Sequence, residues 1–171
     1  MKGYVQVYTG DGKGKTTAAL GLAIRAAGAG KKVFFAQFVK GQQYSEIKLI
    51  SEKLPEIEIQ QFGRRCFIKK EPQAEDIKIA REGFKKVQEK IASHEYDLII
   101  LDEINIAIYY ELITVDEVLD LINNKPANLE LVLTGRKAPN RIIEAADLVT
   151  EMQEIKHYYQ KNVQAREGIE Y

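Results

Sequence analysis

A chain of 171 residues is long enough to bury a full core around a central sheet, and we expect residues 1–171 to form one domain. Its 25 lysines and arginines balance its 25 aspartates and glutamates, so no overall basic field favours nucleic acid as a partner. The first strand pattern begins at Tyr4, no apolar run could cross a membrane, and Cys66 is the single cysteine. We therefore expect a cytoplasmic protein without a membrane partner or an internal disulfide.

Apolar strand patterns alternate with helical patterns along the chain. Strands are expected at 4–8, 33–38, 57–62, 97–102 and 129–133, and a last strand begins at Leu148. Helices are expected at 16–27, around 77–91 and at about 140–146, and a capping box of Thr114 and Glu117 begins another short helix. This alternation predicts an α/β fold with a mostly parallel sheet and helices on both faces. In such sheets ligands bind beyond the carboxyl ends of the strands.

A glycine-rich turn follows the first expected strand. Residues 9–17 read Thr-Gly-Asp-Gly-Lys-Gly-Lys-Thr-Thr, and the first helix begins within them. Such a turn directs backbone N–H groups and a lysine at a polyphosphate, so we interpret it as a variant P-loop rather than a generic turn. Lys15 should reach the terminal phosphates, whereas Lys13 either adds charge there or is solvated. The nucleotide-binding residues predicted here are Thr9, Gly10, Asp11, Gly12, Lys13, Gly14, Lys15, Thr16 and Thr17.

An acidic pair follows the clearest buried strand. The apolar run 98–101 ends in Asp102 and Glu103, which is a Walker B pattern. A strand of this kind brings a carboxylate beside the phosphates, so we expect Asp102 and the Thr16 hydroxyl to hold Mg²⁺. Lys15, Thr16, Asp102 and Glu103 are the expected catalytic group. Arg136 follows another buried strand and either contacts the phosphates or lies in solvent.

The whole chain resembles the ATP:corrinoid adenosyltransferases of the P-loop type. The similar blocks are, in order, residues 9–21, 37–41, 101–105, 134–136, 146–152 and 156–171. The resemblance implies a P-loop NTPase (RecA-like) fold, a three-layer sandwich around a mostly parallel sheet. It also implies transfer of the 5′-deoxyadenosyl group of ATP to Co(I) of a reduced corrinoid, with release of triphosphate, in adenosylcobalamin synthesis or salvage. The acceptor would be cob(I)yrinic acid a,c-diamide or cob(I)alamin, with Mg²⁺ as cofactor, a reducing flavoprotein as a partner and a homodimer as the assembly.

Further site residues follow from this resemblance. Lys40 and Gly41 end the second strand and are expected to contact the nucleotide or the corrin ring. Phe67 falls where the family places an aromatic segment near the corrin ring, although a loop aromatic tucked into the core is the alternative. Because cobalt is the nucleophile, the reaction needs no attacking water. We therefore expect Glu103 to serve the metal shell or the geometry of the site rather than water activation.

Other activities would use the same general features. An ordinary P-loop ATPase or a small-molecule kinase also needs the P-loop, Asp102 and Arg136, and only the family-like blocks distinguish the adenosyltransferase. A binding or signalling module gated by nucleotide would use the loop as a switch, without turnover. The products separate these hypotheses, since adenosyl transfer releases intact triphosphate whereas an ATPase or a kinase releases ADP.

Overall fold

The computed structural model describes residues 2–42, 44–64, 68 and 71–170. Its strands form a six-stranded, all-parallel sheet in the order β3-β2-β4-β5-β1-β6. The prediction of a mostly parallel sheet is confirmed. The strands are β1 (Val5–Thr9), β2 (Val33–Phe38), β3 (Ile57–Phe62), β4 (Leu98–Asp102), β5 (Glu130–Thr134) and β6 (Leu148–Glu151).

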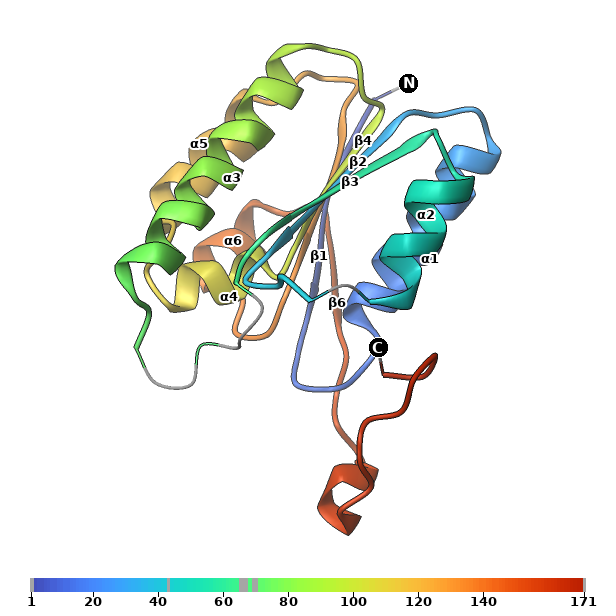
Figure 1. Ribbon diagram of the computed structural model, residues 1–171. Helices are drawn as coiled ribbons and strands as arrows, with labels where there is room; N and C mark the ends of the chain where they lie inside the picture. Colours follow the sequence, from blue (N-terminus) through green and yellow to red (C-terminus); the bar gives the residue numbers. More distant parts are fainter. Residues whose placement is uncertain (1, 43, 65–67, 69–70, 171) are drawn as a thin grey trace.

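Helices cover both faces of the sheet, as expected for a three-layer sandwich (Figure 1). One face carries α1 and α2, and the other carries α3 to α6. A 3₁₀ helix at Tyr158–Lys161 lies in the C-terminal tail. The helices are α1 (Lys15–Gly28), α2 (Ser45–Lys53), α3 (Ala74–Ala92), α4 (Ile104–Tyr109), α5 (Val115–Asn124) and α6 (Asn140–Ala145). None of those in the described part of the chain is long and apolar enough to cross a membrane.

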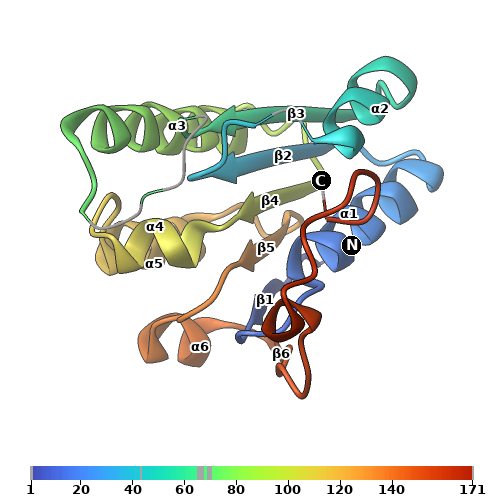
Figure 2. The same cartoon turned by 60° about the horizontal axis from the view of Figure 1, so that its bottom comes forward.

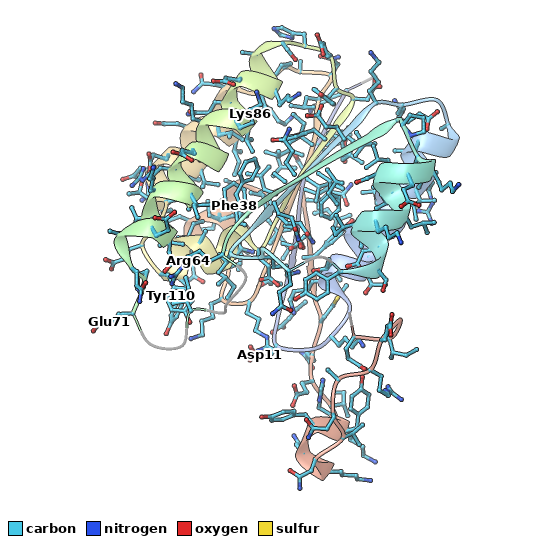
Figure 3. The ribbon with its side chains drawn as sticks, in the orientation of Figure 1. Asp11, Phe38, Arg64, Glu71, Lys86 and Tyr110 are labelled. Carbon is cyan, nitrogen blue, oxygen red and sulfur yellow. The ribbon has the colours of Figure 1, made fainter. Side chains whose placement is uncertain are left out.

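The apolar strands are buried on both sides, which explains their continuous hydrophobic sequence. Side chains alternate along β2: Phe34 and Phe38 pack with α3, whereas Phe35 packs with α1. Figure 3 shows Phe38 between the layers of the molecule. On the α3 side Phe84 is 3% exposed, and burial of such a side chain contributes about 1.5–3 kcal/mol.

Two elements differ from expectation. The helices α2 and α4 were not expected, because they are short and have weak apolar periodicity. A connection such as α2 is nevertheless required, since the neighbouring parallel strands β2 and β3 need a crossover. The first helix is nearly all apolar in sequence, but Ile24 is 51% exposed, because a helix that covers a sheet buries only one face.

Candidate nucleotide-binding site

A cavity of about 750 Å³ opens at the carboxyl ends of the strands. Figure 2 views the molecule from this end, where the C-terminal tail passes close to α1. Five segments far apart in the sequence line the cavity: the P-loop with the start of α1, the segment from the end of β2 into α2, the residues from Glu103 into α4, the turn after β5, and the tail. Its lining includes Gly12, Lys13, Gly14, Lys15, Thr16, Thr17, Leu20, Val39, Lys40, Tyr44, Leu49, Glu103, Ile106, Arg136, His157 and Glu170.

The P-loop has the backbone that its glycines predict. Gly10 and Gly14 have φ of 91° and 120°, in the region that L side chains rarely adopt. Gly12 is needed for a different reason, because an added Cβ would lie 2.7 Å from the carbonyl oxygen of Met152. The Gly12 N–H also donates to that oxygen at 2.7 Å, so the strand end of β6 supports the loop.

Lys15 begins α1 and bends back over the loop. Its Nζ donates to the carbonyl oxygens of Gly10 and Gly12, both at 2.7 Å. Burial lowers the pKa of this lysine. The ammonium therefore lies at the centre of the turn, next to the backbone groups that a phosphate would meet.

Asp102 ends β4 and is fully buried beside the P-loop. Its Oδ1 accepts from the hydroxyls of Thr16 at 2.9 Å and Thr134 at 2.6 Å. Its Oδ2 accepts from Gln37 Nε2 at 3.1 Å and Lys40 Nζ at 2.9 Å. Four donors, from α1, β5, β2 and the loop after β2, thus fix the carboxylate, and its contact with Thr16 joins β4 to the P-loop.

Lys40 and Glu103 complete an ionic cluster at this point. The Lys40 ammonium lies 3.5 Å from Glu103 Oε1 and donates to Thr16 Oγ1 at 2.9 Å. Burial alone would lower the pKa of Lys40, but the carboxylates of Asp102 and Glu103 outweigh it and raise the pKa above its ordinary value. Burial raises the pKa of Glu103; the Asp102 charge adds to this effect and Lys40 opposes it.

The turn after β5 closes the site on another side. Arg136 NH2 donates to the Asp11 carbonyl oxygen at 3.0 Å and extends over the P-loop, where the arginine lines the cavity. Asn105, fully buried in α4, donates from Nδ2 to the Gly135 carbonyl oxygen at 3.2 Å. Its Oδ1 has no hydrogen-bond partner among the described residues.

The C-terminal tail forms one wall of the cavity. Lys13 donates to the Ile169 carbonyl oxygen at 2.9 Å and to Glu170 Oε1 at 3.2 Å. Glu170 also accepts hydrogen bonds from Tyr158 and Arg166. The Lys13 side chain, 45% exposed, therefore ties the P-loop to the tail at the edge of the cavity.

The structure brings most of the predicted site residues together. Residues 12–17, Lys40, Glu103 and Arg136 line the cavity, and Asp102 lies directly behind them. The Thr9 hydroxyl instead accepts from the Ala138 N–H, and Gly41 packs against the backbone of residues 63–64. Phe67 lies outside the described residues. Gln37 was missed as a site residue, although a glutamine inside an apolar strand is itself a signal of a buried polar contact.

The oxygen atoms gathered here suit a hard divalent cation. Thr16 supplies a hydroxyl, and Asp102 and Glu103 supply carboxylates, which are the ligand types that Mg²⁺ prefers. The described residues contain no group of three or more His, Cys, Asp or Glu side chains placed to hold a metal by themselves.

Comparison with known proteins agrees with this geometry. Residues 1–171 match the family model described as ATP:corrinoid adenosyltransferase BtuR/CobO/CobP. A corrinoid adenosyltransferase of Sinorhizobium sp. is 36% identical over 99% of this chain and 81% of its own, and one of Escherichia coli K12 is 34% identical over 99% and 86%. The crystal structure of a KaiC-like protein of Pyrococcus horikoshii matches with a TM-score of 0.57 over 91% of this chain and 74% of its own, at 15% identity. That likeness concerns the fold alone and agrees with the expected P-loop NTPase architecture.

Proposed function

The chain belongs to the ATP:corrinoid adenosyltransferase family, and we propose how its residues carry out that reaction. ATP binds with its triphosphate at residues 10–17, and the Co(I) of a reduced corrinoid attacks the 5′-carbon of the ribose. The cobalt electron pair forms the Co–C bond. The bond from that carbon to the phosphate oxygen breaks, and triphosphate leaves with its electron pair.

The main task of the site is to stabilise the charge on the departing triphosphate. Backbone N–H groups of the P-loop, the Lys15 ammonium and the Arg136 guanidinium surround the position proposed for it. Such preorganised donors act where charge develops in the transition state. Mg²⁺, held by Thr16 and Asp102, would supply further positive charge to the leaving group. Because cobalt is the nucleophile, Glu103 positions Lys40 and the cation rather than activating water.

The remaining parts of the proposal concern the second substrate and its supply. The cavity is also lined by apolar side chains, Leu20, Leu49 and Ile106, which suit the nucleoside and the approach of a large acceptor. The acceptor is cob(I)yrinic acid a,c-diamide or cob(I)alamin, and a reducing flavoprotein in the cytoplasm supplies the electron. One sheet with helices on both faces supports a single domain across residues 1–171, and we propose that two such chains form a homodimer.

One observation carries this proposal: the 2.9 Å hydrogen bond between Thr16 Oγ1 and Asp102 Oδ1. It places the P-loop hydroxyl and the Walker B carboxylate at one point of the cavity wall, as a nucleotide–metal site requires. An ordinary ATPase or kinase would also need this contact between the hydroxyl and the carboxylate, but the family match over the whole chain does not favour those activities.

The test mixes the protein with ATP, Mg²⁺ and chemically reduced cobalamin and follows the corrinoid spectrum for a light-sensitive Co–C bond. Lys15→Ala should lose about 100-fold or more of the rate, because it removes a charge at the leaving group. The matched control is Lys86→Ala on α3, whose side chain pairs with Glu89 away from the cavity (Figure 3). A near-normal rate for Lys15→Ala would mean that the phosphates bind elsewhere.

A further inference from the structure

The Lys40 ammonium shares its oxygen contacts with the proposed metal. It lies 2.9 Å from Thr16 Oγ1, 2.9 Å from Asp102 Oδ2 and 3.5 Å from Glu103 Oε1. Thr16 and Asp102 are the side chains that the proposed function assigns to Mg²⁺. A magnesium ion takes oxygen ligands at about 2.0–2.1 Å, so a metal ion that bridged Thr16 Oγ1 and Asp102 Oδ2 on the side of the ammonium would need the place that the Lys40 nitrogen occupies.

The backbone holds Lys40 firmly in this place. Val39 has φ of 61°, a left-handed conformation that is costly for a β-branched residue and that turns the chain at the end of β2. On the other side, a Cβ at Gly41 would lie 2.2 Å from the Gly63 carbonyl oxygen, so the chain passes tightly against the backbone of residues 63–64. Strain of this kind persists where the surroundings impose a conformation, and here it directs the lysine toward Asp102.

The position also meets an electrostatic need. The Asp102 carboxylate is fully buried and Glu103 lies beside it, so two acidic groups share a site of low exposure. A cation must balance them when no metal is bound. The Lys40 side chain, only 16% exposed, supplies that charge. The neighbouring lysines have other partners, because Lys15 donates to the P-loop carbonyls and Lys13 to the tail.

We propose that Lys40 is a built-in competitor of the divalent cation, which keeps the metal position closed until nucleotide phosphates give the ammonium a new partner. The inference rests on the proposed function, because it takes Thr16 and Asp102 as the metal-holding residues. Free metal must then displace a buried ion pair, whereas metal arriving with a triphosphate does not leave the lysine unpaired. The cation and the nucleotide therefore bind together, and the metal binds weakly alone.

The test measures Mn²⁺ binding to nucleotide-free protein by electron paramagnetic resonance, with Mn²⁺ as a probe that accepts oxygen ligands. Lys40→Met should bind Mn²⁺ about 10-fold more tightly than the unaltered protein, or about 1.4 kcal/mol. Lys86→Met on α3 is the control, because it removes the same charge where the side chain pairs with Glu89 away from the cavity, and its Mn²⁺ affinity should stay at the unaltered value. Lys40→Arg retains a cation at this position, so it should bind Mn²⁺ as weakly as the unaltered protein.

Unchanged or weaker Mn²⁺ binding by Lys40→Met would overturn the inference, and so would an equal gain in Lys86→Met. If Lys40→Met does not fold, Lys40→Gln carries the same expectation, because its amide can still donate to Asp102 without a charge. The titration contains neither ATP nor corrinoid, so its result is independent of the adenosylation assay. A protein that fails to adenosylate but shows the Mn²⁺ gain would refute the proposed function and leave the competition by Lys40 standing.

Discussion

Asp102→Asn is the substitution whose cost can be worked out most fully from the structure. The side chain is fully buried and accepts from Thr16, Thr134, Gln37 and Lys40. In its better orientation the new amide keeps its oxygen toward Gln37 and Lys40, and its NH₂ group faces the two hydroxyls. The Lys40 ammonium then loses its charged partner, which costs about 1–2 kcal/mol, and the Thr16 and Thr134 hydroxyl protons lose their acceptor, which together costs about 1–3 kcal/mol.

These contributions predict a loss of about 3 kcal/mol in the free energy of unfolding, and a fall of about 6–12 °C in Tm for a chain of this size. The assay is urea unfolding followed by circular dichroism at pH 7, without metal or nucleotide, so that only the protein contacts count. Asp120→Asn on the exposed surface of α5 is the control and should change stability by less than about 0.5 kcal/mol. A loss below about 1 kcal/mol in Asp102→Asn would refute the four-donor geometry.

Three other substitutions test separate parts of the account. Glu103→Gln should keep the adenosylation rate within about tenfold, because no general base is needed; a loss of 100-fold, or an ATPase background that it abolishes, would contradict this. Gly10→Ala should destabilise the protein by about 2 kcal/mol or more in urea unfolding, because φ is 91° and the new Cβ would lie 2.4 Å from the Met152 carbonyl oxygen; unchanged stability would contradict that close approach. Asp76→Asn should lower the free energy of unfolding by about 2 kcal/mol at pH 7. Burial would raise the pKa of Asp76, but Arg64 and the Gln73 N–H outweigh it and lower the pKa below its ordinary 3.8. The stability that the ionised Asp76 carboxylate contributes is therefore lost as the pH falls below that value. The difference in free energy of unfolding between the unaltered protein and Asp76→Asn should then become smaller in acid. A difference that does not change with pH would argue against the ion pair between Asp76 and Arg64.

Local patterns in the sequence predict much of this fold because the interactions behind them are local. Continuous apolar runs mark strands buried on both faces, and the Thr114 capping box begins α5 as expected. The P-loop and the Asp102 pattern both lie at carboxyl ends of strands, so the topology of a parallel sheet brings them together. The order of the strands, however, depends on packing between distant segments, which no local pattern records.

The unpredicted features of the site come from contacts between segments far apart in the chain. The contact of Lys13 with Glu170 spans almost the whole sequence, so nothing near Lys13 indicates its partner. The position of Lys40 depends on a left-handed Val39, which no propensity favours. The short α2 carries only Ile47 and Ile50 as buried anchors, too few for a clear helical period.

The central claim is that ATP, anchored at residues 10–17, loses its triphosphate whole while its 5′-carbon joins cobalt. The most direct test analyses the phosphate products of a single turnover by ³¹P nuclear magnetic resonance, with Co–C bonds counted in the same sample from the corrinoid spectrum. The account predicts one intact triphosphate for each Co–C bond. Formation of ADP and orthophosphate, with no Co–C bond, would contradict it and identify an ordinary ATPase.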